Sequence, residues 1–167
     1  MVTVWIVRHG CAGHKDEWHG DDDERPLDPA GAAQAAALAD LLVTAGPRHL
    51  LSSPARRCVD TLRPLADRLG LPIDVDARLC PQHGFEPLMA LILDPSSDGT
   101  VVCGHGEAMR PLLSALRHHR VAVVDDEPDA RLLLKGVAWE IAPGDPLRLR
   151  LHAPVPVRDC PQHPMRG

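Results

Sequence analysis

The stretch Val2-Thr-Val-Trp-Ile-Val-Arg-His-Gly10 decides the fold class, because it combines a short apolar run with a sharp polar stop at a glycine. Residues 2–7 are rich in β-branched side chains, which is typical of a strand that is buried on both faces. The stretch Thr100-Val-Val-Cys-Gly-His-Gly106 has the same form and also ends in a histidine followed by glycine. Two such runs predict a central sheet with polar groups collected at the ends of its strands.

Helical and strand patterns alternate between and after these two stretches. Asp28-Pro29 is typical of a helix start, with aspartate as the N-cap and proline at the first helical position. Further strands are predicted at 49–52, 73–79, 132–141 and 147–151, and further helices at 54–70, 85–93 and after 106. In the helix after residue 106, Pro111 predicts a late start or a bend. The alternation predicts an α/β fold, a three-layer α/β/α sandwich with a mostly parallel central sheet.

Length and composition exclude several classes of protein. The 167 residues are 44% hydrophobic and 25% charged, with a net charge of −5, so nothing points to disorder or to nucleic-acid binding. No apolar run approaches the roughly 18 residues of a membrane helix, and the start lacks the basic leader of a signal peptide. With five cysteines, an odd number, the sequence predicts reduced thiols in the cytoplasm. We expect one domain over residues 1–151, followed by a proline-rich tail at 152–167, and the oligomeric state stays open.

Polar motifs follow three of the predicted strands. Arg8-His9-Gly10 follows the first, Ser52-Ser53-Pro54 with Arg57 follows the second, and Gly104-His105-Gly106 follows the strand at 100–103. Ligands of parallel sheets bind at the carboxyl ends of the strands, and a helix N-terminus near Arg57 also favours an anion. The pattern predicts a phosphate pocket in which a histidine could attack phosphorus and form a covalent phosphohistidine.

These motifs, together with Arg25-Pro26-Leu27-Asp28, Gly31, Gln34 and Thr61, resemble the histidine phosphatase superfamily, the clan of phosphoglycerate mutases and acid phosphatases. The sequence is most similar to the small phosphohistidine phosphatases and to the histidine phosphatase domain fused to some Nudix hydrolases. The resemblance spans roughly residues 1–151 and implies a phosphoglycerate mutase-like fold. It also implies that His9 is the nucleophile, that Arg8 and Arg57 bind phosphoryl oxygens, and that His105 stabilises the transition state.

Elementary chemistry agrees with these roles. Guanidinium groups match phosphate oxygens, and neighbouring cations should hold His9 neutral and nucleophilic at pH 7. Because the arginines supply the charge stabilisation, we expect neither a metal ion nor another cofactor. Arg25, Gly10, Gly106 and Glu107 are the expected substrate-binding residues.

One position departs from the resemblance. Many family members carry a proton-donating glutamate two residues after a leucine, where this sequence has Leu79-Cys80-Pro81. Glu107 is a candidate replacement. Phosphohistidine needs such an acid least, because a protonated phosphoimidazole expels neutral imidazole. We therefore expect a metal-independent phosphatase that acts through His9 on a protein phosphohistidine. The alternatives are a small-molecule phosphatase for sugar or nucleotide phosphates and a noncatalytic phosphate-binding module.

Other motifs leave two interpretations open. The acidic run 21–24 could recognise a basic partner or form a solvated loop, and Arg25 could reach the pocket or pair with that run. His14 and Trp18 could line the pocket rim or pack within their loop. Cys-Pro-Gln-His occurs twice, so the pairs Cys80/His83 and Cys160/His163 could form a zinc site if the tail folds back, although the spacing is not that of a usual zinc finger.

Overall fold

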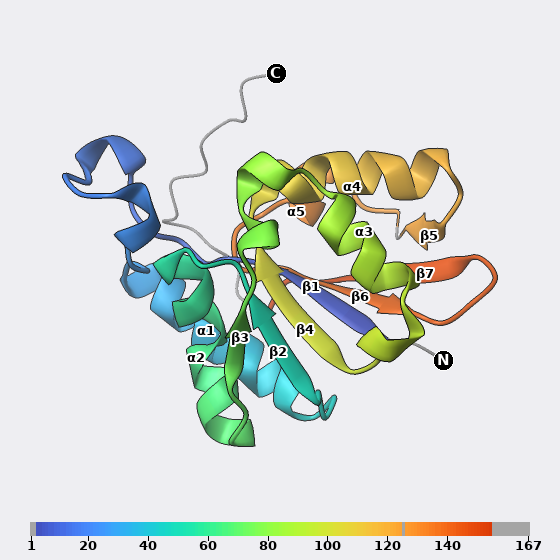
Figure 1. Ribbon diagram of the computed structural model, residues 1–167, viewed down its shortest axis with the longest axis horizontal. Helices are drawn as coiled ribbons and strands as arrows, with labels where there is room; N and C mark the ends of the chain where they lie inside the picture. The colour runs from blue at the N-terminus through green and yellow to red at the C-terminus, as the bar shows by residue number, and fades with distance from the viewer. Residues whose placement is uncertain (1–2, 125, 155–167) are drawn as a thin grey trace.

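The computed structural model describes residues 3–124 and 126–154. In this part of the chain, a seven-stranded sheet of order β3-β2-β4-β1-β6-β7-β5 carries helices on both faces (Figure 1). The strands are β1 (Val4–Arg8), β2 (His49–Ser52), β3 (Ile73–Val75), β4 (Thr100–Gly104), β5 (Ala122–Val124), β6 (Ala138–Ala142) and β7 (Leu147–His152). The α-helices are α1 (Pro29–Val43), α2 (Arg56–Leu69), α3 (Glu86–Leu93), α4 (Gly106–His118) and α5 (Asp129–Leu132).

The pairing of β1 sets the geometry of the site. β1 runs parallel to β4, with Arg8 opposite Gly104, and antiparallel to β6. β4 in turn runs parallel to β2, which runs parallel to β3. Four neighbouring strands therefore end at the same edge of the sheet, and the residues that follow β1 and β4 lie side by side.

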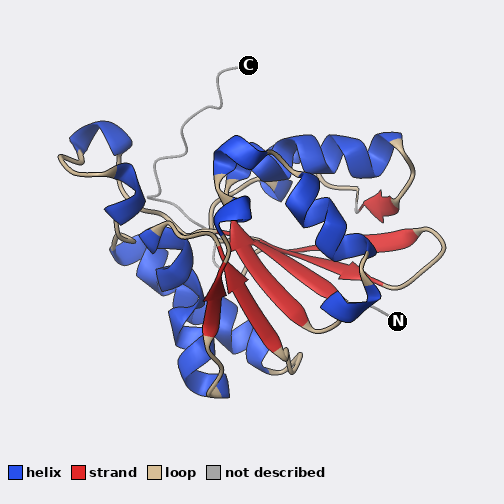
Figure 2. Ribbon diagram, viewed as in Figure 1, coloured by secondary structure: helices blue, strands red, loops and turns tan. Residues whose placement is uncertain are grey.

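The sheet separates two hydrophobic cores, because successive side chains of a strand point to opposite faces. In β1, Val4 and Ile6 belong to the core beneath α3 and α4, whereas Trp5 and Val7 belong to the core beneath α1 and α2. Figure 2 shows the resulting helix, sheet and helix layers. The prediction of a three-layer α/β/α sandwich with a mostly parallel sheet is confirmed.

The predicted elements differ from the structure in three places. The strand predicted at 73–79 ends at Val75, because Ala77–Leu79 forms a 3-10 turn capped by the Asp76 carboxylate. The strand predicted at 132–141 is wrong in its first half, where Leu132 closes α5 with its side chain fully buried, and β6 begins only at Ala138. Helix α4 does not start late, since it runs from Gly106 through Pro111.

Two further observations concern the remaining sequence expectations. β5, which sequence patterning missed, pairs in parallel with β7 at the edge of the sheet. Within residues 3–124 and 126–154, no helix combines the length and the apolar character that crossing a membrane requires. The predicted tail at 152–167 falls almost entirely outside the described residues.

Candidate functional site

Three strand ends bring together the residues that the motifs predicted. Arg8 and His9 follow β1, Arg57 lies in the first turn of α2 after β2, and His105 follows β4. His9, Arg57 and His105 are buried, with exposed fractions of 6%, 5% and 1%. The imidazole rings of His9 and His105 meet edge to face, with 5.5 Å between their centroids. The structure therefore assembles these side chains into one site at the carboxyl edge of the sheet.

The surroundings of His9 fix its tautomer and its charge. Nδ1 lies 2.8 Å from the carbonyl oxygen of Gly10, and since a carbonyl only accepts, Nδ1 carries the proton and Nε2 keeps its lone pair. Burial lowers the pKa of His9 well below its ordinary value. The hydrogen bond to Gly10 opposes this shift, and the charges of His105, Arg57 and Arg8 reinforce it. At neutral pH, His9 thus presents a neutral, unprotonated Nε2, as a nucleophile requires.

Three buried nitrogen atoms around His9 have no hydrogen-bond partner among the described residues. They are Nε of Arg8, Nε of Arg57 and Nδ1 of His105. Other atoms of two of these side chains do have partners: His105 Nε2 lies 2.8 Å from Ser53 Oγ, and Arg8 Nη1 donates to the Leu133 carbonyl oxygen. A buried polar atom without a partner costs roughly 1–3 kcal/mol, so these nitrogen atoms are the groups whose hydrogen bonds an oxyanion bound at the site would complete.

Several motif residues hold the backbone around His9. Gly10 N–H donates to Thr61 Oγ1 at 3.0 Å, and Gln34 Oε1 accepts from Cys11 N–H at 2.7 Å. A Cβ atom on Gly31 would lie 1.9 Å from the Cys11 carbonyl oxygen, so only glycine allows α1 to pack against this loop. The structure thus places Gly10, expected to bind substrate, in the scaffold of the site with its amide already bonded.

Gly106 and Glu107 lie beside Arg8. A Cβ atom on Gly106 would come within 2.8 Å of the Arg8 guanidinium, so the glycine makes room for that side chain. Glu107 is exposed in the first turn of α4 and lines the same pocket as Arg8 and His9. Its position is compatible with contact to a bound substrate.

The loop between β1 and α1 closes the site from the side. Arg25 was expected either to reach the pocket or to pair with the acidic run 21–24, and it does both. It is buried and lines the pocket, and its Nε donates to Asp22 Oδ1 at 2.9 Å. Asp22 holds Arg57 as well, through its carbonyl oxygen at 2.7 Å and its carboxylate at 3.2 Å. Partial burial acts to raise the pKa of Asp22, but the hydrogen bond from Arg25 and the charge of Arg57 outweigh it and lower the pKa.

The resulting pocket is small and strongly cationic. Its volume is about 180 Å³, and it is lined by Arg8, His9, Gly13, Lys15, Asp22, Arg25, Arg57, Glu107 and Lys135. Sequence reasoning missed Lys15, Lys135 and the pairing role of Asp22. A signal existed for the lysines, because they are the only two in the sequence, but nothing in the pattern placed them at a strand end.

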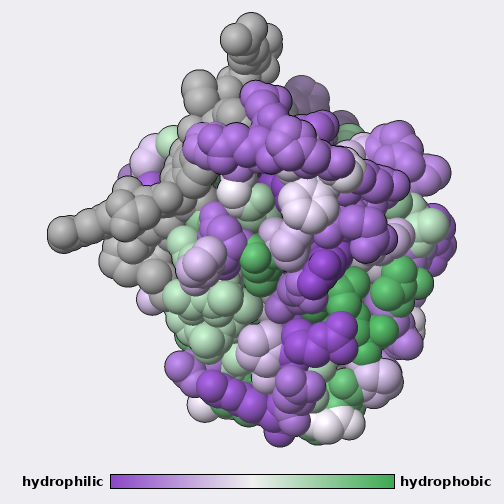
Figure 3. Space-filling model, turned by 90° about the vertical axis from the view of Figure 1, so that its left-hand side faces the viewer, coloured by the Kyte–Doolittle hydropathy of each residue, from purple (hydrophilic) through white to green (hydrophobic). Residues whose placement is uncertain are grey.

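A second pocket of about 250 Å³ adjoins the first and shares Gly13 and Arg25 with it. His14 and Trp18 line this second pocket and not the pocket at His9. Trp18 is 37% exposed, and its indole N–H donates to the Asp21 carbonyl oxygen at 2.8 Å. Figure 3, which views the molecule from the side of this loop, shows a largely hydrophilic face with scattered apolar patches.

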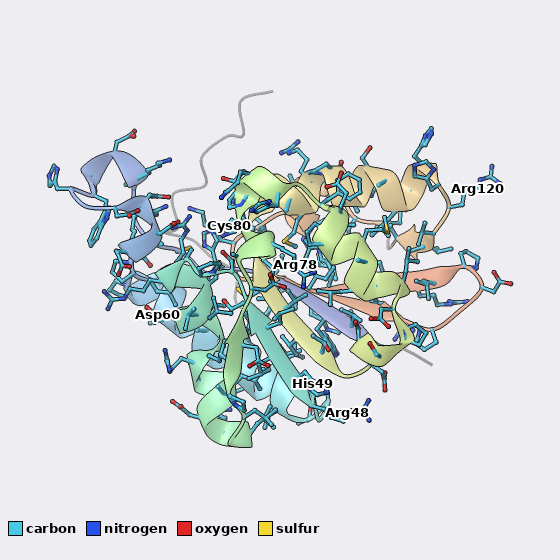
Figure 4. All side chains as sticks on the ribbon, viewed as in Figure 1. Arg48, His49, Asp60, Arg78, Cys80 and Arg120 are labelled. Atoms are coloured by element: carbon cyan, nitrogen blue, oxygen red, sulfur yellow. The ribbon has the colours of Figure 1, made fainter. Side chains whose placement is uncertain are left out.

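The cysteines give no support for a metal centre in the described part of the chain. Cys80 lies at the carboxyl end of the parallel strands (Figure 4), but no three His, Cys, Asp or Glu side chains of the described residues cluster as metal ligands. Cys160 and His163 of the zinc hypothesis lie outside the described residues. Cys58 and Cys103 are buried free thiols. Cys11 is disulfide-bonded, which corrects the expectation that every thiol is reduced.

Comparisons with known proteins agree with this geometry. A family model described as "Histidine phosphatase superfamily (branch 1)" matches residues 4–83. The chain is 46% identical over 67 residues to an 8-oxo-(d)GTP phosphatase of Mycolicibacterium smegmatis, covering 40% of this chain and 21% of that protein. It is 31% identical over 109 residues to a glucosyl-3-phosphoglycerate phosphatase of Mycolicibacterium vanbaalenii, covering 62% of this chain and 47% of that protein.

Solved structures share the fold. The protein histidine phosphatase SixA, complexed with tungstate, superposes with a TM-score of 0.64 at 22% identity, over 91% of this chain and 95% of that one. The chain spans less than half the length of the two curated relatives described above.

Proposed function

We propose that this chain, whose residues 4–83 match the family model of the histidine phosphatase superfamily, is a metal-independent phosphatase that acts through a covalent phosphohistidine on His9. The observation that carries the proposal is the set of unpartnered nitrogen atoms on Arg8, Arg57 and His105. Three buried atoms beside an unprotonated imidazole nitrogen match the oxygens of one phosphoryl group.

The reaction has two displacements at phosphorus. In the first, the Nε2 lone pair of His9 forms the P–N bond while the bond to the leaving group breaks, and the electron pair goes to that group. In the second, a water oxygen attacks phosphorus, its proton is released, the P–N bond breaks and orthophosphate departs. Arg8, Arg57 and His105 stabilise the charge on the equatorial oxygens in both steps.

Two substrate classes fit this mechanism. A protein phosphohistidine suits a site in which Pro81 stands where a proton donor would be expected, because its imidazole leaves as a neutral base. A small-molecule phosphate suits the enclosed cationic pocket, and the two curated relatives are named as phosphatases of small molecules. A module that binds phosphate without turnover would have the same cradle of arginines but would form no covalent intermediate.

Trapping of radioactive phosphate on the chain, with the reaction quenched in an alkaline denaturant, tests the proposal directly. With labelled aryl phosphate, we expect acid-labile, base-stable label on the wild-type chain and none on His9→Ala. Turnover should persist in EDTA and should be inhibited competitively by vanadate, which occupies the same nitrogen donors. An unlabelled wild-type enzyme, or activity that a chelator abolishes and a divalent ion restores, would overturn the mechanism.

A further inference from the structure

The second pocket, which adjoins the site of His9, differs from it in chemical character. Gly13 and Arg25 belong to both pockets, so the cavity continues from the phosphoryl site into the β1–α1 loop. Of the described residues that line the second pocket, only Arg25 is a lysine or an arginine. Its other side chains are Ala12, His14, Glu17, Trp18, Pro26, Leu27 and Asp28. A molecule that spans both pockets therefore carries its phosphate at one end and a group without negative charge at the other.

Trp18 gives the second pocket an aromatic wall. Its side chain is 37% exposed, whereas the other two tryptophans of the sequence, Trp5 and Trp139, are buried. The indole N–H donates to the Asp21 carbonyl oxygen at 2.8 Å, and a Cβ atom on Gly20 would lie 3.2 Å from Nε1, so the ring packs against its own loop. The polar atom of the ring is thus satisfied, and the exposed part is apolar surface on which a planar group can stack.

The β1–α1 loop projects from the body of the molecule (Figure 1), yet hydrogen bonds hold the lining of the second pocket in place. The Asp28 carboxylate accepts from Gly13 N–H at 2.9 Å and from Gly31 N–H at 2.8 Å. Arg25 Nη1 donates to the Ala12 carbonyl oxygen at 2.7 Å. These bonds tie the start of the loop to its end and to α1. A pocket that is formed before binding costs less conformational entropy when a ligand enters.

The Glu17 carboxylate determines which groups a ring in the second pocket can carry. Glu17 is exposed at the end of the 3-10 helix Lys15–Glu17 and lines the pocket. A carboxylate only accepts hydrogen bonds, so it repels a further phosphate and attracts N–H donors. Nucleobases such as guanine carry N–H donors in the plane of a ring that can also stack on an aromatic side chain. The second pocket therefore matches a nucleobase in both its wall and its charge.

We propose that the second pocket binds the base of a nucleotide while the phosphate of the same molecule occupies the site at His9. The base stacks on Trp18, and its N–H groups face Glu17. The inference rests on the proposed function and narrows its small-molecule class to nucleotides. Sugar phosphates lack the planar ring, and phosphorylated proteins present a polypeptide chain at this place, so both serve as comparison substrates.

A pair of substrates isolates the contribution of the base. Guanosine 5′-monophosphate and ribose 5-phosphate release the same kind of primary alkoxide, so the ratio of their kcat/KM values depends on the base and not on the leaving group. The wild-type ratio should be at least about tenfold in favour of the nucleotide. In Trp18→Ala, the value for the nucleotide should fall about 5- to 100-fold, as for loss of an aromatic side chain on which a base stacks, while the value for ribose 5-phosphate should change less than about twofold.

Matched variants and melting temperatures exclude a general effect on the fold. Trp18→Phe keeps an aromatic ring and should retain most of the preference for the nucleotide. Leu93→Ala removes an exposed apolar side chain at the end of α3 and should change neither substrate. Glu17→Gln should lower the value for the nucleotide a few-fold and leave ribose 5-phosphate unchanged, whereas Glu24→Gln, which removes a charge from the same loop, should affect neither.

Tryptophan fluorescence separates this inference from the proposed function. Because Trp5 and Trp139 are buried, a base that stacks in the second pocket changes mainly the emission of Trp18. In His9→Ala, which cannot turn over, guanosine 5′-monophosphate should quench the emission to saturation, and ribose 5-phosphate should not. The quenching should disappear in His9→Ala/Trp18→Phe. This result would support the base pocket even if the trapping experiment found no phosphoenzyme.

Three results would overturn the inference while leaving the phosphatase proposal intact. The first is an equal loss on both substrates in Trp18→Ala, which would make Trp18 a support of the phosphoryl site. The second is a wild-type enzyme that treats the two substrates alike, with no saturable quenching by the nucleotide. The third is an effect of Trp18→Ala on a phosphohistidine peptide and not on the nucleotide, which would assign the second pocket to a polypeptide.

Discussion

The two sides of the pocket are built in different ways. The pocket floor, Arg8, His9, Arg57 and His105, is attached to strand and helix ends, and its chemical groups are largely buried. The loop wall, residues 11–28, is exposed throughout 14–21 and contains only two short 3-10 helices. Side-chain contacts such as those of Asp28 and Arg25 hold it in place. The floor can thus keep one chemistry constant while the wall varies the choice of substrate.

The largest effect expected of any substitution comes from the floor. His9→Ala removes the attacking nitrogen, so kcat should fall by at least about 10³-fold, while the melting temperature stays near that of the wild type. The matched control is His49→Ala, at the opposite end of β2 (Figure 4), which should retain full activity. Comparable activity in the two variants would contradict the assignment of the chemistry to the floor.

The dependence of the rate on the leaving group tests whether Glu107 takes part in the chemistry of the floor as a proton donor. General acid catalysis contributes about 10²- to 10⁴-fold, so without an acid the poor leaving groups should lose about that much. We expect kcat/KM to fall steeply from phosphoramidates and aryl phosphates to phosphoserine and glycerol phosphate. Glu107→Gln should leave the slope unchanged. A shallow series that steepens in Glu107→Gln would instead identify Glu107 as the acid.

The pH profile sharpens the contrast between buried and exposed histidines. A histidine with the ordinary pKa of 6.5 would be only about one-tenth neutral at pH 5.5. Burial lowers the pKa of His9, so the activity should fall on the acidic side only at a pH below 5.5. At pH 5.5 the activity should therefore not show the tenfold loss expected of an ordinary histidine. NMR titration of the imidazole in the ligand-free protein measures this without interference from substrate ionisation. The lowered pKa of His9 also reduces the free energy of unfolding as the pH falls below 6.5, because the imidazole takes up a proton more readily in the unfolded chain than in the folded one.

The smallest effect is expected in the wall. Asp22→Asn weakens an ion pair that shares the guanidinium group of Arg57, so vanadate should bind a few-fold more tightly, in line with about 0.2–1 kcal/mol for a partly exposed pair. Because its neighbours lower the pKa of Asp22, the carboxylate stays ionised at any pH above the ordinary pKa of an aspartate. The ion pair with Arg57 is lost only when the pH falls through the lowered pKa of Asp22. The effect of the substitution should therefore be constant between pH 5 and 8. Weaker vanadate binding would show that Asp22 instead orients Arg57 for the ligand.

The floor was predictable from sequence, whereas of the wall only Arg25 was expected at the pocket. Parallel strands bring their carboxyl ends to one edge of the sheet. The motifs that follow the predicted strands 2–7, 49–52 and 100–103 therefore had to lie close together, and they contain the residues of the floor. Lys135 could not be found in this way, because the chain before β6 was predicted as strand, whereas Leu132 ends a helix and Gly136 turns the backbone. The position of Asp22 depends on a long-range pair with Arg57, for which local patterning has no signal.

The placement of both lysines also changes how the protein responds to ordinary amine chemistry. The lysine side chains of this sequence are the exposed Lys15 and the buried Lys135, so a reagent that acylates lysine reacts within these 167 residues only at the pocket. Surface labelling, which scatters over most proteins, becomes here a report on the occupancy of one site. The mass added to each lysine, with and without a bound oxyanion, would map the pocket in solution without any engineered probe.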